Sequence, residues 1–440
     1  MSKTFREWNP EQATLLPPSV LDFVPENHLA HFVRKMTLEQ LDLRAILDAY
    51  DEERGYPPYH PVMMTALLLY GYSQGIYSSR RIAGACQQRV DFMAVTGMQQ
   101  PDFRTVSLFR KRHLKALKGL FEQVLKLCQK AGMVKLGHVA LDGTKIRANA
   151  SKHKAMSYGH MKKVEPELAA EVERWFAQAD AMDEREDAEY GVGRRGDELP
   201  DWVADKQKRL EKIRQAKAEL EAEARAAAEV QKSSAPPERQ EKKDGQANSE
   251  VAAPADKAQK NFTDPESRIM KTGDGFIQGY NAQAAVDADS QVIVAQTLNN
   301  SANDKKQLIP MLDQIRKNNG RQAREISADA GYCSDENLKE LSRRRIRGYV
   351  ATGRQKHGKS AAAEDRPKSA WVQRMRARLR QGAYRSRYRL RKQVVEPVFG
   401  LIKQARGFRQ FLLRGEENTA AEWSMLCTAH NILKLAAVHP

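Results

Sequence analysis

A regular succession of strand-like and helix-like segments after residue 262 limits the folds that this chain of 440 residues can adopt. Strand patterns are rich in apolar and β-branched residues, whereas helix patterns repeat apolar residues every three to four positions. The predicted elements are, in order, strand 279–286, strand 291–298, helix 304–317, strand 324–329, helix 334–344, strand 348–352, a basic loop, helix 394–404 and helix 421–435. This alternation predicts a mixed sheet flanked by helices.

An earlier apolar run, at 134–141, predicts one further strand, which ends at Asp142-Gly143. The segment 150–262 separates this strand from the others and is rich in Ala, Glu and Lys. Helical spacing of its apolar residues predicts two helices, 165–185 and 203–228, that pair as an antiparallel hairpin. We therefore interpret the whole segment as an insertion.

The pattern of the first 133 residues predicts helices and no strands. Pro61 suits the first turn of an apolar helix, and Ser78-Ser79 suits the cap of the next one. A basic helix then starts near Asp102 and carries Arg110 and Arg112. Two short helices followed by a basic one are typical of a helix-turn-helix-like DNA reader, but also of a helical bundle with a basic face. The sequence leaves both alternatives open.

Without the insertion, the chain has the element order of a ribonuclease H-like nuclease core: strand, strand, strand, helix, strand, helix, strand, helix. The predicted fold is an α/β catalytic core, with a ribonuclease H-like mixed sheet flanked by helices, preceded by an all-α N-terminal domain. The predicted domains are a helical DNA-binding domain at 1–133, the catalytic domain at 134–149 and 263–440, and the helical insertion at 150–262. Within the insertion, about 230–260 is too polar to form a packed core, which predicts disorder.

Three acidic residues occupy corresponding places in this pattern. Asp142 ends the first strand, Asp329 ends the fourth, and Glu396 lies in the helix after the fifth. Carboxylates that converge from distant segments suit Mg²⁺, and two such ions clamp the attacking and leaving oxygens of a phosphodiester. Lys403 lies two helical turns beyond Glu396, where it can bind a phosphate. Each residue also has an ordinary interpretation, as a turn former for the aspartates and as a salt-bridge partner for Glu396.

Four other acids of the same region fit structural roles. Asp287 and Asp289 suit turns, Asp304 suits a helix N-cap, and Asp335 suits a first helical turn. They are weaker candidates for metal ligands.

The net charge of +17 is concentrated in one segment. Between Arg343 and Arg414, 22 Lys and Arg stand against three acids, which accounts for the whole excess. Interleaved aromatic residues favour nucleic acid over a lipid surface as the polyanionic partner. A solvated basic loop is the plainer alternative.

Several classes of protein are not expected. No apolar run approaches the roughly 18 to 20 residues of a membrane span, and no secretory signal is visible. The four cysteines are scattered, which argues against a disulfide framework or a zinc site and fits a reducing cytoplasm. A Gly-rich phosphate loop is absent, so an ATP-driven mechanism is not expected.

Taken together, the motifs resemble those of the DDE-type insertion-sequence transposases of bacteria. The residues that carry the resemblance are Leu141-Asp142-Gly143-Thr144, Asn261–Arg268, Gly279–Gln283, Ala328–Tyr332, Val395–Gly400 and His430–Lys434. The resemblance implies that Asp142, Asp329 and Glu396 form a metal-binding catalytic triad for two Mg²⁺ ions, with Mn²⁺ as a substitute.

The resemblance also implies a phosphate-binding signature. The Tyr-Arg-Glu-Lys signature of these transposases looks like Tyr388, Arg391, Glu396 and Lys403, but four residues rather than three separate Arg391 from Glu396. Lys392 stands at the expected place, so the choice between Arg391 and Lys392 stays open.

The implied function is a DNA transposase that cleaves the ends of its element and joins the 3′-hydroxyls to target DNA. Its implied partners are double-stranded DNA, as terminal inverted repeats and as target, and further copies of itself in a homodimer or higher oligomer. The expected location is the bacterial cytoplasm, at the nucleoid. The alternatives are a ribonuclease H-like nuclease without strand transfer and a non-catalytic DNA-binding protein derived from a transposase.

Overall fold

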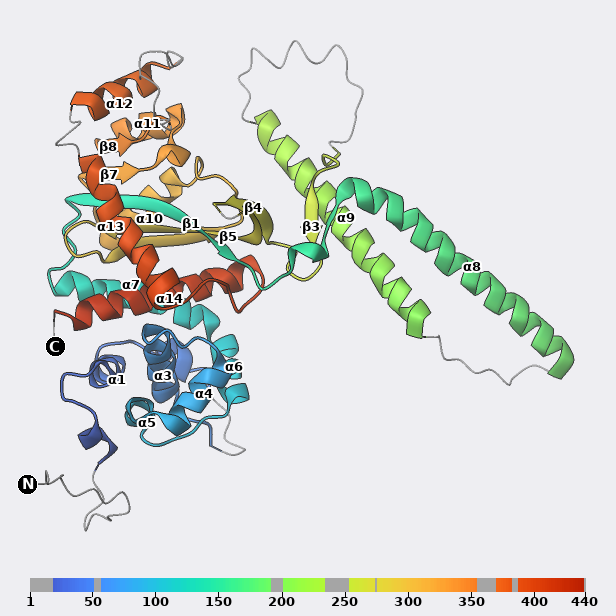
Figure 1. Cartoon of the computed structure of the whole chain (residues 1–440), viewed down its shortest axis with the longest axis horizontal. Helices are drawn as coiled ribbons and strands as arrows, with labels where there is room; N and C mark the ends of the chain where they lie inside the picture. The colour runs from blue at the N-terminus through green and yellow to red at the C-terminus, as the bar shows by residue number, and fades with distance from the viewer. Residues whose placement is uncertain are drawn as a thin grey trace, which may run out of the picture.

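The computed structural model describes residues 19–50, 57–190, 201–233, 253–273, 275–353, 369–381 and 387–438. Within these residues, six strands form a mixed sheet, helices cover the sheet, and a long helical hairpin projects away from the body (Figure 1). In the same part of the chain, no helix combines the length and the apolar content that a membrane crossing requires.

The N-terminal part is helical, as predicted. Pro61 stands in the first turn of its helix, and the Asp102 carboxylate accepts a hydrogen bond from the backbone of Arg104 at 2.7 Å, which caps another. The helices are α1 (Leu29–Glu39), α2 (Arg44–Leu47), α3 (Pro61–Ser73), α4 (Ser79–Gln88), α5 (Val90–Thr96), α6 (Phe103–Arg112) and α7 (Leu114–Lys130).

The sheet combines antiparallel and parallel neighbours. Its strands are β1 (His138–Arg147), β4 (Arg268–Thr272), β5 (Gly275–Asp287), β6 (Ile293–Asn299), β7 (Glu325–Ala328) and β8 (Arg347–Val350). β1 pairs antiparallel with β5 and parallel with β7, which pairs parallel with β8. The other edge of β5 pairs with β4 near its start and with β6 farther along. β1 therefore lies in the interior of the sheet.

The helices of the α/β part pack around this sheet. They are α10 (Leu308–Asn319), α11 (Asp335–Arg343), α12 (Ala370–Gln381), α13 (Leu390–Gly400), a π-helical turn (Leu401–Ala405) and α14 (Glu416–Ala436). α13 crosses β1 and β5 (Figure 1). The buried helix α14 packs against β6 and also against α3 and α7, so the N-terminal helices and the sheet share one apolar core. The predicted domain boundary at 133 falls in the turn between α7 and β1.

The first strand differs from its predicted bounds. It begins at His138 and continues through Asp142 to Arg147. The residues before it cannot extend the strand because Leu136 has a left-handed backbone, with φ +54°. The residues after Asp142 are held by β5, up to the pair Arg147 and Gly279. Asp142 therefore lies within a strand rather than at its end.

Two elements of the sheet and its flanking helices were not predicted. The short strand β4 lies outside the expected elements, and α12 lies in the segment expected to be a basic loop. Trp371, Val372, Met375 and Leu379 are spaced as one helical face, and α12 packs on α11 and β8. The many arginines of α12 concealed this apolar spacing.

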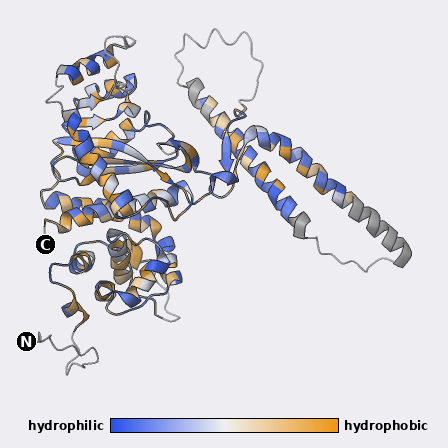
Figure 2. Cartoon of the chain, in the orientation of Figure 1, coloured by the Kyte–Doolittle hydropathy of each residue, from blue (hydrophilic) through white to orange (hydrophobic). Residues whose placement is uncertain are grey.

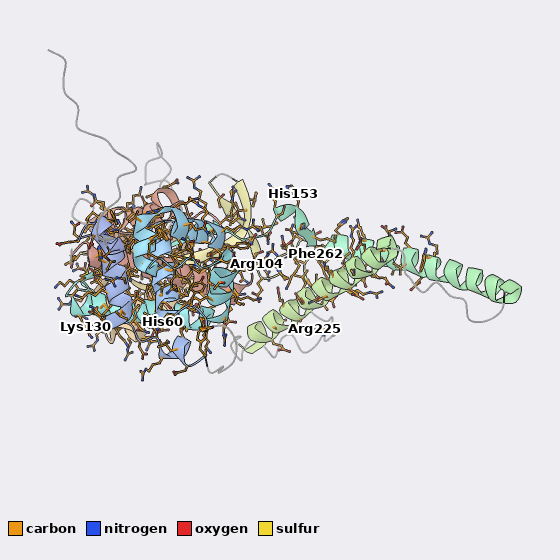
Figure 3. The ribbon with its side chains drawn as sticks, turned by 90° about the horizontal axis from the view of Figure 1, so that it is seen from below. His60, Arg104, Lys130, His153, Arg225 and Phe262 are labelled. Carbon is orange, nitrogen blue, oxygen red and sulfur yellow. The ribbon has the colours of Figure 1, made fainter. Side chains whose placement is uncertain are left out.

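The insertion forms the predicted hairpin, from α8 (Tyr158–Tyr190) and α9 (Asp201–Ser233), and the short strands β2 (Ala155–Ser157) and β3 (Gln259–Asn261) pair at its root. Figure 2 shows many hydrophilic residues along the coloured part of the hairpin, with hydrophobic residues interspersed. Its root, near His153 and Phe262, adjoins the side of the body that carries Arg104 (Figure 3). A small separate core joins the two helices, formed by Tyr158, Met161, Leu168, Leu210, Ile213, Ala216 and Leu220. Of the segment predicted to be disordered, 234–252 lies outside the described residues.

Candidate active site

Two of the three predicted carboxylates come together through the pairing of β1 with β7. The parallel register places Leu141 opposite Ala328, so Asp142 and Asp329 follow these partners on neighbouring strands. The Asp329 carboxylate also accepts a hydrogen bond from the backbone of Gly331 at 2.8 Å, which begins the short turn Ala330–Tyr332. The sheet thus brings together two acids that lie far apart in the sequence.

Arg391 of α13 links Asp142 to the third acid. Its guanidinium donates to the Asp142 carboxylate at 2.7 Å and lies 3.8 Å from the Glu396 carboxylate. The Arg391 and Asp142 side chains are nearly buried, whereas 52% of the Glu396 side chain is exposed. Glu396 therefore borders the site from its open side, with Arg391 between it and Asp142.

The charges of this site perturb one another. Burial raises the pKa of Asp142 from 3.8 to about 6, with a smaller upward contribution from Asp329, while Arg391 acts in the opposite direction. Burial by itself would lower the pKa of Arg391. The negative charges of Asp142 and Asp329 outweigh this effect and help to keep the pKa of Arg391 above its usual value. The site consequently concentrates negative charge that requires a nearby cation.

Lys403 lies in the π-helical turn that follows α13, and it reaches β1 beside the acids. Its ammonium donates to the Thr144 hydroxyl at 2.6 Å and to the carbonyl of Lys145 at 3.1 Å. Burial lowers the pKa of Lys403. Pro397 lies inside α13, which begins at Leu390.

The donor set suits a hard divalent cation. Carboxylate oxygens are the ligands that Mg²⁺ prefers, and Asp142 and Asp329 present them from adjacent strands. Among the described residues, no group of three or more His, Cys, Asp or Glu lies close enough to hold a metal ion. Glu396 would complete the set only if Arg391 moved from between it and Asp142.

Of the two candidate phosphate-binding residues, Arg391 and not Lys392 faces the acids. Arg391 is buried at the site, whereas Lys392 is exposed. Tyr388 lies half-buried just before α13, near enough to Arg391 to raise the pKa of that arginine. Of the signature residues, Arg391 therefore contacts Asp142 directly, and Tyr388 and Glu396 lie near Arg391. Lys403 contacts the strand of Asp142 at Thr144.

The two arginines predicted on the basic helix α6 differ in position. Arg112 is exposed, and its guanidinium stacks over the Tyr50 ring at 4.8 Å. Arg110 is buried and donates to Tyr72, to the carbonyl of Tyr77 and to Ser79. The expectation that Arg110 contacts DNA is wrong for this structure, because its guanidinium is used inside the N-terminal helices.

Asp304 is the site residue that the sequence interpretation missed. It was expected to cap a helix, but α10 begins four residues later. Its carboxylate instead accepts hydrogen bonds from the side-chain amides of Asn281 and Gln283, both at 2.7 Å. The buried polar residues at 281 and 283, next to the apolar run 284–286, were the available signal.

The other structural expectations for acids agree with the structure. Asp287 accepts from the backbone of Leu136 at 2.7 Å and of Asp289 at 3.0 Å, as a turn residue does. Asp335 lies in the first turn of α11, which Ser334 caps.

Comparison with known families agrees with these motifs. Residues 241–432 match the family model described as Transposase DDE domain, and residues 18–112 match that described as Transposase domain (DUF772). The first match includes Asp329 and Glu396 but begins after the hairpin, so Asp142 lies outside it. No curated protein and no solved structure gave a match. The two family matches lie in the order expected of one protein, and the chain belongs to the insertion-sequence DDE transposases.

Proposed function

We propose that this transposase cleaves the ends of its insertion element and joins the freed 3′-hydroxyls to target DNA by metal-dependent phosphoryl transfer. The observation that carries the proposal is the placement of Asp142 and Asp329 on adjacent strands, with Arg391 and Lys403 beside them. Carboxylates for metal ions and cations for phosphates are the two kinds of group that such a reaction requires.

The topology supports a ribonuclease H-like core. Along the sheet the strands run β6, β5, β1, β7 and β8, with β5 antiparallel to both neighbours and the last three parallel. This arrangement, with the acids on β1, after β7 and on a later helix, matches the element order expected of such a nuclease.

Asp142, Asp329 and Glu396 would hold the metal ions. When bound, Mg²⁺ supplies a Lewis acid that polarises the scissile phosphate and activates the attacking oxygen. Lys403 contributes a positive charge from the buried side of the site, and its two hydrogen bonds to β1 fix its position. Arg391 would leave Asp142 and bind a phosphate group of the DNA, because a guanidinium can donate two parallel hydrogen bonds to a phosphate.

DNA would be bound by exposed basic surfaces outside the site. The exposed basic residues of α6 are Arg104, Lys111 and Arg112, and α12 adds several arginines. Both helices can neutralise phosphates, which makes binding salt-dependent. α3, α4 and α6 are the two short helices and the basic helix of the helix-turn-helix-like alternative, and they pack against one another as it requires, although a basic bundle would do so as well.

The test uses the full-length protein, Mg²⁺ and a DNA duplex that carries the inverted repeats flanking its gene. We expect nicking at the repeat ends and, in a second assay, 3′ ends covalently joined to a target plasmid. Asp142→Asn should abolish both reactions and preserve DNA binding. Asp289→Asn, an exposed turn residue, is the matched control and should change neither.

The outcomes separate the rival functions. Undiminished cleavage by Asp142→Asn would contradict the assignment of this acid. Cleavage without joined product would favour a nuclease, and binding without either reaction would favour a non-catalytic DNA-binding protein.

A further inference from the structure

The face of β1 opposite Arg391 carries a buried polar cluster. Its members are the side chains of Asn281 and Gln283 on β5, Tyr332 after Asp329, and Asp304 before α10; we call this the amide cluster. Gln283 pairs directly with Gly143 in the antiparallel register, so it lies on the other face of β1 from Asp142.

The members of the amide cluster are joined by hydrogen bonds. One oxygen of Asp304, Oδ1, accepts from both amides at 2.7 Å. Gln283 also accepts from the Tyr332 hydroxyl and donates to Asn281 at 3.1 Å. Gln283, Asn281 and Tyr332 are almost fully buried. The backbone of Gln283 is held in turn by Trp423 of α14, whose indole donates to its carbonyl at 3.1 Å. The cluster is therefore tied to both β5 and the helical layer.

Two glycines let the amide cluster touch the catalytic elements. A Cβ atom at Gly143 would collide with the Gln283 amide and would lie 2.9 Å from Asp304 Oδ1. A Cβ atom at Gly331 would lie 2.9 Å from Asp329 Oδ1 and 3.1 Å from Asp304 Oδ2. Asp304 thus contacts the backbone next to both strand acids, and only a residue without a side chain leaves the required room.

The free-energy cost of burying these polar groups indicates that they have a role beyond packing. No salt bridge of the described residues involves Asp304, although its carboxylate lies beside that of Asp329. Burial raises the pKa of Tyr332 well above its usual value, and Asp304, Asp142 and Asp329 add to this effect. Polar groups buried at such cost require their full set of hydrogen bonds, so they hold one geometry.

We propose that Asp304 and Gln283 are positioning residues that hold the turn after Asp329 at a fixed depth relative to Asp142. Tyr332 connects this turn to Gln283 through a hydrogen bond. The Asp304 carboxylate lies against both Gly331 and Gly143. In that position, the two strand acids would both be available to hold one divalent cation. This inference rests on the proposed function of Asp142 and Asp329, and it explains why three separate sequence motifs occur together.

The charge of Asp304 and its hydrogen-bond acceptor can be separated by substitution. Asp304→Asn keeps an oxygen for both amides and removes the charge, whereas Asp304→Ala removes both. Mn²⁺ affinity of the full-length protein, measured from the spin-resonance signal of free Mn²⁺, reports the geometry of the acids without any need for turnover. Asp289→Asn is the control for the loss of one carboxylate.

We expect Asp304→Ala to weaken Mn²⁺ binding about 10- to 100-fold, the usual effect of removing a residue that orients metal ligands. Asp304→Asn should stay within about 2-fold of the unmodified protein, and Tyr332→Phe should weaken binding by an intermediate amount. The Mg²⁺ concentration for half-maximal cleavage should rise in the same order. Thermal unfolding with Mn²⁺ absent confirms that each variant is folded, and Tyr332→Phe supplies the test if Asp304→Ala is not.

Two results would overturn the positioning role. Equal losses in Asp304→Asn and Asp304→Ala would show that the charge itself binds the cation, and unchanged affinity in Asp304→Ala and Tyr332→Phe would show that the cluster is irrelevant to it. Asp142→Asn keeps this failure distinct from that of the proposed function. If Asp142→Asn loses Mn²⁺ while Asp304→Ala retains it, the positioning role alone fails; if Asp142→Asn retains Mn²⁺, the metal assignment fails.

Discussion

The two faces of β1 at Asp142 use different chemistry. On the face toward α13, Asp142 and Thr144 contact the cations of Arg391 and Lys403. On the opposite face, Gly143 lies over the neutral amides of Asn281 and Gln283. The side chains of a charged pair can give up their partner and bind a metal ion or a phosphate instead. In a buried amide network, a change of partners leaves polar groups unsatisfied, which costs free energy. Under the proposed function, one face carries the reaction and the other fixes its geometry.

The largest effect should come from the charged face. Arg391→Ala leaves Asp142 without its paired cation, which raises the pKa of that carboxyl further, because Arg391 now lowers it. We expect DNA cleavage at neutral pH to fall about 10²- to 10³-fold, as for other lost transition-state contacts, and its acid limb to move to higher pH. A pH series of cleavage rates measures both. Lys392→Ala, an exposed neighbour, should change them little, and equal effects of the two variants would contradict the assignment of Arg391.

A buried charge away from both faces gives the next largest effect. Burial raises the pKa of Glu422 in α14 from 4.5 to about 7. The stability that this carboxyl contributes is therefore complete below pH 4.5 and is lost as the pH rises through 7, by about 3 kcal/mol. Urea unfolding at pH 5 and pH 8 should show this loss in the unmodified protein and a smaller one in Glu422→Gln.

The control for this prediction lies on the same helix. Glu417 is exposed, and Glu417→Gln should keep the pH dependence of the unmodified protein. If Glu422→Gln keeps it as well, Glu422 is not the group that titrates.

The amide face should be sensitive to volume rather than charge. Gly143→Ala places a methyl group against Gln283 and Asp304. We expect it to destabilise the protein by about 1–3 kcal/mol through overpacking and to slow cleavage about 10²-fold through misplacement of Asp142. Gly84→Ala is the matched control, because its methyl group would meet no atom within 4 Å and lies within helix α4, where alanine stabilises. Normal cleavage by Gly143→Ala would remove the distinction between the faces.

The smallest effect should come from charges on the hairpin. Glu165 of α8 pairs with Lys217 of α9 at 2.8 Å and with Arg214 at 3.3 Å, and all three are partly exposed. Glu165→Gln should destabilise the hairpin by less than about 1 kcal/mol, an effect that 1 M salt suppresses. Hydrogen exchange of the α8 and α9 amides measures it. A destabilisation as large as that expected for Gly143→Ala would contradict the small contribution expected of these exposed ion pairs.

The sequence was sufficient for the regular part of the fold. The strands β5, β6, β7 and β8 and the hairpin helices were predicted because their apolar spacing is regular. α12 was missed since its apolar face is interrupted by arginines, and the start of β1 was misplaced because nothing in the sequence marks the backbone of Leu136.

The candidate site could be predicted in part for a similar reason. Asp142 and Asp329 were predicted as candidates because each follows an apolar run, and the pairing of β1 with β7 brings them together. The burial of Arg110 and the contacts of Asp304 depend on segments far away in the sequence, which local spacing does not reveal. The choice of Arg391 over Lys392 likewise depends on which side of α13 packs on β1.

The hairpin also delays the assembly of the candidate site during synthesis. Residues 148–274 separate β1 from its neighbour β5, and a ribosome that adds about 5–20 residues per second needs on the order of ten seconds to make them. Throughout that time the nascent β1 has neither of its partner strands, since β7 is made later still. The hairpin helices α8 and α9 pack chiefly on each other and can pair meanwhile. Asp142 is thus among the first residues of the candidate site to be synthesised and precedes Asp329 and Arg391, so the proposed DNA cleavage would require a chain that is almost complete.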